Sequence, residues 1–134
     1  NEVLFSEYLS KKAFIGLDAY LTRHAMLSDM IISINEHFDL ITNKIKLPNS
    51  TDYLSEDKLL PLFESLQRKY DYVFIISPAL RTCYDALILG EFSDGLLYIK
   101  EDRLPSKSVL NEHASLLNQL GKPILGIVIT NIDL

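Results

Sequence analysis

The chain has 134 residues, of which 48% are hydrophobic and 23% charged, and its formal net charge is −5. This composition is typical of a globular domain and excludes a disordered chain. The acidic balance, without a basic tract, argues against a nucleic-acid partner. No apolar run approaches the roughly 20 residues that a membrane-spanning helix needs. The single cysteine, Cys83, rules out an internal disulfide and fits a reducing compartment.

The first third of the chain predicts short elements. Apolar residues recur at helical spacing over residues 2–12 and 17–21, and a further short helix is expected near residues 27–32. Residues 38–42 alternate between apolar and polar and predict a strand, which a loop around Pro48 follows.

The rest of the chain predicts alternating helices and strands. Ser55 and the acidic residues after it predict a helix start, although Pro61 implies either a kink or a start near Leu60. The buried stripe expected on this helix consists of Leu59, Phe63, Leu66 and Tyr70. The uninterrupted apolar run at residues 72–77 predicts a parallel strand that is buried on both faces and ended by Pro78.

Further along, residues 84–92 predict a helix and residues 96–99 a strand. A helix capped at Ser106 or Ser108 is expected to run to Gly121, which is a natural residue after a helix end. Residues 124–129 then form a second fully apolar run and predict another strand.

This order predicts an α/β fold. Strands that alternate with helices imply right-handed crossovers and a mainly parallel sheet of about four strands, in two or three layers. No repeat or linker divides the sequence, so a single domain over residues 1–134 is expected. The residues expected to be buried in the sheet, or to pack a helix on it, are Phe74, Ile75, Ile99, Ile127, Ile129, Leu117 and Leu120. The residues expected to cover the other face are Val3, Leu4, Phe5, Leu9, Phe14, Met30 and Ile31.

Five short sequence segments, in this order, resemble the later part of the bacterial tyrosine autokinases (BY-kinases) of capsule and exopolysaccharide synthesis. They lie at residues 16–21, 70–73, 85–89, 94–95 and 125–128 and read GLDAYL, YDYV, DALIL, DG and LGIV. Their spacing follows the family almost without gaps from Gly16 to Asp133. The resemblance implies a P-loop-NTPase-like, Rossmann-like domain related to the partition ATPases, without the P-loop strand.

The nucleotide motifs of that family are degenerate in these residues. No G-x-x-x-x-G-K-[ST] motif occurs in the chain. Where the family carries an acidic residue after its central strand, this chain has Ile76, followed by Ser77 and Pro78. An isoleucine cannot bind magnesium or orient a water, and phosphoryl transfer depends on such positioning.

Two further positions match the family's nucleotide region. Asp85 matches a residue close to the nucleotide, but it equally fits the cap of the helix that begins there. A gapless match puts Thr130, with Asn131 one place later, where the family has an Asn that holds the base. The resemblance therefore implies no catalytic residue, no cofactor and no metal.

Other chemistry is weakly supported. The three histidines show no metal-ligand spacing. A triad of Ser77, Asp85 and His113 is disfavoured because no nucleophile elbow surrounds the serine.

The expected function is that of a non-catalytic, tyrosine-kinase-like domain that acts by assembly or partner binding in capsule or exopolysaccharide biosynthesis and export. Its expected place is the cytoplasmic side of the bacterial inner membrane. The expected partners are a membrane-anchored chain-length or export protein, or the protein's own transmembrane region, and further copies of itself. The alternative is a fragment of an active ATP-dependent tyrosine autokinase whose P-loop lies upstream of Asn1. A third reading is a partition-type relative with an unrelated protein partner.

Overall fold

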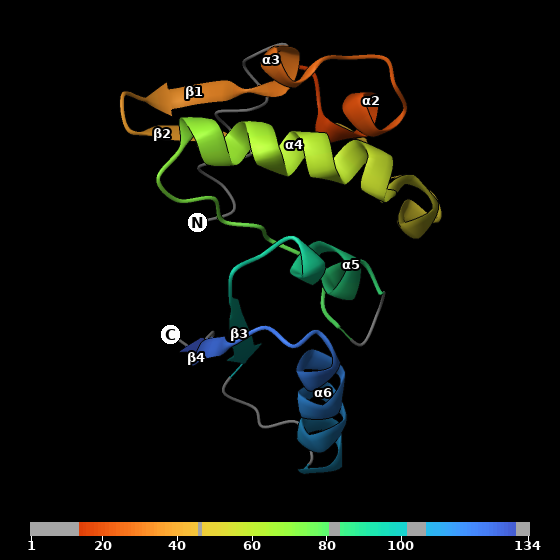
Figure 1. The fold of residues 1–134 in the computed structure, drawn as a ribbon, viewed down its shortest axis with the longest axis vertical. Coiled ribbons are helices and arrows are strands. Elements are labelled where there is room, and N and C mark those ends of the chain that lie inside the picture. Colours follow the sequence, from red (N-terminus) through yellow and green to blue (C-terminus); the bar gives the residue numbers. More distant parts are fainter. Residues whose placement is uncertain (1–13, 46, 81–83, 102–106, 131–134) are drawn as a thin grey trace. The chain divides into compact units, whose positions relative to one another are not determined.

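The structure is a computed structural model that describes residues 14–45, 47–80, 84–101 and 107–130 (Figure 1). Packing divides the chain into two compact units, Asn1–Lys58 and Leu59–Leu134. The single domain expected from the sequence stays a prediction. None of the helices among the described residues is long and apolar enough to cross a membrane.

The first unit consists of short elements around a small core. They are α2 (Leu17–Leu21), α3 (Leu27–Met30), β1 (Ile32–Asn35), β2 (Phe38–Leu40) and a 3₁₀ helix (Ser50–Tyr53). Strands β1 and β2 pair antiparallel, with Ile32 opposite Leu40. The side chain of Asn35 accepts a hydrogen bond from the backbone N–H of His37 at 2.9 Å, which supports the tight turn between the strands. Leu21, Met30 and Ile32 are buried.

The predictions for this unit are mostly confirmed, with one correction. The helices expected at residues 17–21 and 27–32 are α2 and α3, and the strand expected at residues 38–42 is β2. Helix α3 ends at Met30, however, and the following residues form β1, which the sequence analysis missed. The β-branched residues Ile31 and Ile32 favour a strand over another helical turn. The helix expected at residues 2–12 lies outside the described residues.

Gly16 and Asp18 join α2 to the segment that follows β2. The backbone N–H of Leu17 donates to the carbonyl of Thr42 at 2.9 Å. The buried carboxylate of Asp18 accepts from the backbone N–H of Lys44 at 2.6 Å. A Cβ on Gly16 would overlap both the Asp18 carboxylate and the Lys44 backbone nitrogen, so only glycine fits this approach.

Helix α4 (Glu56–Lys69) begins at the end of the first unit and continues into the second. Its acidic first turn and basic last turn complement the helix dipole. The expected start near Leu60 is wrong, because the helix begins at Glu56 and Pro61 lies inside it. The buried residues, at helical spacing, are Leu59, Leu62, Phe63 and Leu66. Tyr70, expected in the same stripe, follows the helix and is half-buried.

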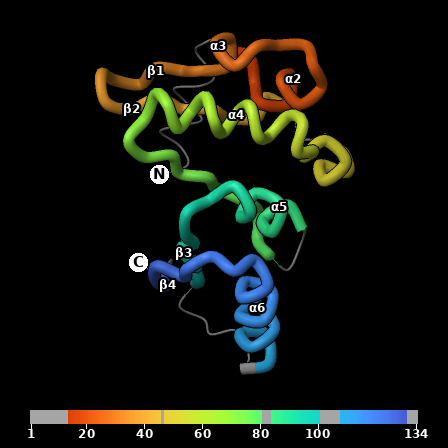
Figure 2. The backbone as a smooth tube through the Cα atoms, in the orientation of Figure 1, coloured from red at the N-terminus to blue at the C-terminus, as the bar shows by residue number. Residues whose placement is uncertain are grey.

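The remaining elements of the second unit are α5 (Asp85–Glu91), β3 (Leu96–Glu101), α6 (Lys107–Gln119) and β4 (Ile124–Thr130). Figure 2 shows the chain running from β3 through α6 to β4, and the two strands pair in parallel. The glycine after α6, Gly121, has a φ of 63°, as expected of a residue that ends a helix. The elements predicted at residues 84–92, 96–99, 108–120 and 124–129 are thus confirmed.

The strand predicted at residues 72–77 is not formed. These residues have no regular secondary structure and pair with none of the strands among the described residues, and Phe74 and Ile76 are 79% and 93% exposed. The described residues contain four strands, yet in two separate two-stranded sheets, of which only β3–β4 is parallel. The single, mainly parallel sheet of about four strands is therefore not what the described residues build.

The predicted burial of the sheet is also wrong for most of its residues. Ile99, Ile127 and Ile129 are exposed, and Ile75 is only half-buried. A two-stranded sheet gives each strand one neighbour, and the described residues bury neither strand on both faces. The predicted packing of α6 is confirmed for Leu117, which is buried. Leu120 is half-buried and closely approaches Gly90 of α5.

The predicted cover of the sheet finds no support. Val3, Leu4, Phe5 and Leu9 lie outside the described residues. Phe14 and Ile31 are half-buried, and Met30 is fully buried in the first unit.

Replacing Gly16 by alanine should lower the free energy of unfolding by about 1–3 kcal/mol, because the added methyl group must displace either the Asp18 carboxylate or the Lys44 backbone. Chemical denaturation measures the loss. Gly126→Ala is the control, since its Cβ would meet only Leu97 at 3.9 Å. The free energy of unfolding of this control variant should stay within about 0.5 kcal/mol of that of the unchanged chain. Equal effects at both sites would contradict the close approach at Gly16.

A second pair of substitutions tests the observed distribution of burial. Leu59→Ala should cost about 2–5 kcal/mol, because Leu59 is 1% exposed and its truncation leaves a cavity. Ile127→Ala should cost no more than about 0.5 kcal/mol, because this side chain is 63% exposed. Chemical denaturation measures both changes in the free energy of unfolding. A large loss of stability in Ile127→Ala would contradict the observed exposure and indicate that β4 is buried in a core.

Candidate functional site

Residues Ile76, Ser77 and Pro78, at the end of the expected central strand, are all exposed to solvent, Ile76 almost fully. The hydroxyl of Ser77 donates to the carbonyl of its neighbour Pro78 at 3.2 Å. The side chain of Ile76 offers no oxygen that could hold magnesium or orient a water at this position.

The other expected nucleotide-site residues lie at the ends of regular elements. Asp85 is 4% exposed and is the first residue of α5, whereas the N-cap is Tyr84. The interpretation of Asp85 as the cap residue is therefore wrong. Thr130 ends β4, and its hydroxyl donates to the carbonyl of Lys100 on β3 at 3.3 Å. Asn131 lies outside the described residues.

The sequence raises two other kinds of site, a metal centre and a nucleophile triad. In the described part of the chain, no three His, Cys, Asp or Glu side chains group in a way that could hold a metal ion. The hydroxyl of Ser77 bonds to Pro78, and His113 Nδ1 lies 2.6 Å from the hydroxyl oxygen of Tyr98. The sequence analysis did not find this Tyr98–His113 hydrogen bond, because the two residues lie on different elements, β3 and α6.

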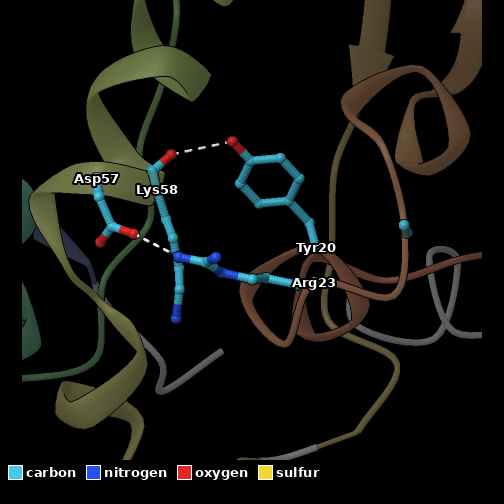
Figure 3. A pocket seen from close by; sticks show the side chains of 5 residues that line it. Tyr20, Arg23, Asp57 and Lys58 are labelled. Atoms are coloured by element: carbon cyan, nitrogen blue, oxygen red, sulfur yellow. Dashed lines mark hydrogen bonds and ion pairs between the residues drawn. The ribbon is translucent and has the colours of Figure 1, made fainter.

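The first unit contains an open cavity of about 370 Å³, which the sequence analysis also missed (Figure 3). Its lining residues come from the end of α2, the loop after it and the first turn of α4, and they are Tyr20, Arg23, Ala25, Asp57 and Lys58. We call it the Arg23–Lys58 cavity. No spacing signal in the sequence could have found it, because about 35 residues separate its two sides.

Two contacts hold the sides of this cavity together. The guanidinium of Arg23 pairs with the carboxylate of Asp57 at 2.7 Å, and the hydroxyl of Tyr20 donates to the backbone carbonyl of Lys58 at 3.0 Å (Figure 3). A hydrogen bond from the Ser55 side chain is the main cause that lowers the pKa of the Asp57 carboxyl, and desolvation opposes it. The charge and hydrogen bond of Arg23 and the charge of Lys58 lower this pKa further. Asp57 is therefore ionised at neutral pH.

Arg23 has an unusual backbone conformation for a residue with a side chain. Its φ is 63°, in the left-handed region that favours glycine. The backbone N–H of Arg23 donates to the carbonyl of Tyr20 at 2.9 Å, so the left-handed residue turns the chain out of α2. Glycine or asparagine usually occupies such a position, and the arginine gave no sign of the turn in the sequence.

Comparison with known proteins defines the class of this fold. No protein-family model matches the chain. The kinase domain of the Escherichia coli tyrosine kinase ETK superimposes with a TM-score of 0.77 and 25% identity, over 90% of this chain and 48% of that one. The chimerical protein CapA2B2 superimposes with a TM-score of 0.78 and 26% identity, over 87% of this chain and 51% of that one. The chain therefore has an α/β fold of the P-loop-kinase type.

A curated relative makes the assignment more specific. The tyrosine-protein kinase CpsD of Streptococcus pneumoniae serotype 4 is 25% identical over 135 residues, which cover all of this chain and 60% of that protein. The resemblance to the bacterial tyrosine autokinases is thus confirmed over most of the chain. The chain spans about 60% of the length of the curated relatives it matches first, so it corresponds to a part of such a protein.

Two substitutions of Arg23 separate the effect of its left-handed backbone conformation on stability from the effect of its ion pair with Asp57. Both Arg23→Gly and Arg23→Ala remove the pair with Asp57, but only glycine adopts a positive φ without a Cβ clash. The glycine variant should therefore have a free energy of unfolding about 1 kcal/mol higher than that of the alanine variant. Thermal or chemical denaturation of the two variants measures the difference, and equal stabilities would contradict the left-handed conformation.

Proposed function

We propose that this chain is a non-catalytic, tyrosine-kinase-like domain of capsule or exopolysaccharide biosynthesis and export. The observation that carries the proposal is Ile76, which by the resemblance to the tyrosine autokinases stands at the position of an acidic residue and whose side chain is 93% exposed. The 134 residues also contain no phosphate-binding loop. The names of the relatives support a role in capsule or exopolysaccharide biosynthesis. One is a tyrosine-protein kinase named CpsD, and a relative from Klebsiella pneumoniae is named as a putative tyrosine-protein kinase in the cps region.

In this proposal the domain acts through assembly and partner binding. Its partner is a membrane-anchored chain-length or export protein, or a transmembrane region of the same protein, on the cytoplasmic side of the bacterial inner membrane. The apolar side chains exposed on β3 and β4 support association, because exposed apolar surface on a sheet is a site for further contacts. The net charge of −5 disfavours a nucleic-acid partner.

One observation favours a second candidate, a part of an active tyrosine autokinase. The matched relatives named as kinases are longer than this chain, which spans about 60% of their length. In that case a phosphate-binding loop upstream of Asn1 would complete the nucleotide site. Ile76 weighs against this candidate, because added sequence does not put a carboxylate at that position.

Calorimetry with ATP and magnesium tests the proposal. The 134-residue chain should show no saturable, magnesium-dependent heat at micromolar ATP, because its sequence has no G-x-x-x-x-G-K-[ST] motif and has an isoleucine, Ile76, at the expected acidic position. Ile76→Asp alone should not produce hydrolysis, since the chain offers no loop to grip the phosphates. Micromolar binding of ATP–magnesium by the unchanged chain would overturn the proposal.

The same assay on a longer natural chain separates the two candidates. Hydrolysis by that chain with Ile76 in place would establish the kinase reading. Hydrolysis that requires Ile76→Asp would support a domain that lost its chemistry at this residue.

A further inference from the structure

The Arg23–Lys58 cavity brings two cationic side chains to one open space. Arg23 and Lys58 both line it, and they come from opposite sides, the loop after α2 and the first turn of α4 (Figure 3). The side chain of Arg23 is 75% exposed, so a ligand reaches its guanidinium directly. A volume of about 370 Å³ lies within the range of small-molecule sites, roughly 300–1,000 Å³.

The lining carries a net positive charge at neutral pH. Its lining residues include two cations and one carboxylate, Asp57, which pairs with Nη2 of Arg23 at 2.7 Å. A guanidinium has several further N–H donors in a planar fork that matches the oxygens of a phosphate group. The ammonium group of Lys58 lies 5.6 Å from the centre of the Tyr53 ring, on a flexible stem that can turn toward the cavity.

The charge of the ligand follows from the competition with Asp57. A carboxylate ligand would replace the carboxylate of Asp57 at Arg23 by a group of the same charge, so the exchange would gain little binding free energy. A phosphate monoester carries about −1.5 to −2 at neutral pH and has three acceptor oxygens. It therefore offers Arg23 more negative charge than Asp57 does, and it has acceptor oxygens left for Lys58. The remaining volume accommodates the group that bears the phosphate, beside the Tyr20 side chain.

We propose that the Arg23–Lys58 cavity binds a phosphate monoester, with Arg23 and Lys58 holding the phosphoryl group and Asp57 competing for Arg23. This inference does not depend on the proposed function, because it concerns residues of the first unit only. A phosphotyrosine side chain and a sugar phosphate both offer this chemistry, and the two differ in whether an aromatic ring accompanies the phosphate.

NMR titration of the 134-residue chain at low salt tests the site, with phosphotyrosine, glucose 1-phosphate and inorganic phosphate as probes and tyrosine as the phosphate-free control. The three phosphates should shift the signals around Arg23 and Lys58, and tyrosine should not. Added salt should weaken the binding, since the contacts are exposed and electrostatic. Tighter binding of phosphotyrosine than of glucose 1-phosphate and inorganic phosphate would support the proposal. It would also identify a phosphotyrosine side chain as the kind of ligand that the cavity binds. Equal affinities would support a site for the phosphoryl group alone.

Substitutions give the decisive comparison. Arg23→Gln and Lys58→Gln should each weaken binding about tenfold, the effect of losing one charge-assisted contact. Asp57→Asn should tighten binding several-fold, because it removes the competing carboxylate. A gain in affinity cannot result from a misfolded variant. The Asp57→Asn measurement therefore tests the proposal even if the other two variants unfold.

Arg68→Gln is the matched control. Arg68 also forms an exposed ion pair, with Glu64 at 3.5 Å, but it lies outside the cavity. This variant should leave the affinity unchanged. The absence of saturable shifts at millimolar phosphate, a loss of affinity in Asp57→Asn, or equal losses in Arg23→Gln and Arg68→Gln would overturn the proposal.

Discussion

The parallel pairing of β3 with β4 is the interaction on which the second unit depends. It joins residues about 30 positions apart, and α6 forms the crossover between them. Parallel strands are stable when neighbouring strands and helices cover both faces. Here each strand has one partner, and Ile99, Ile127 and Ile129 stay exposed. Residues 72–77 likewise pair with none of the described strands, although their sequence is as apolar as that of β4.

This incomplete sheet links the fold to the proposed role. In open α/β sheets, ligands bind beyond the carboxyl ends of the strands, which is where Ile76 and Thr130 were expected to lie. Because residues 72–77 do not form a strand, Ile76 and Thr130 share no sheet edge among the described residues. The apolar surface of β3 and β4 is instead available for contacts with other polypeptide, which suits a domain that works by assembly.

The first unit has polar contacts that its short elements require. Helices of four or five residues are not stable by themselves, so side-chain and backbone bonds from other segments must hold them. Asp18 bonds to the backbone of Lys44, and Tyr20 and Arg23 reach the first turn of α4. The last two contacts also form the walls of the cavity. A contact that stabilises the unit thus places two cations around one open space.

The sequence by itself determined the local elements and the family. Periodicity, capping residues and turn residues predicted α2, α4, α5, β3, α6 and β4, because these signals depend on neighbours in the chain. The expectation that Ile76 stands at the family's acidic position came from the resemblance to the family. Only the tertiary structure decided which strands pair, which apolar residues are buried and where Arg23 and Lys58 meet. Burial and pairing depend on residues far apart in the sequence, and no local pattern specifies how many neighbours a strand will have.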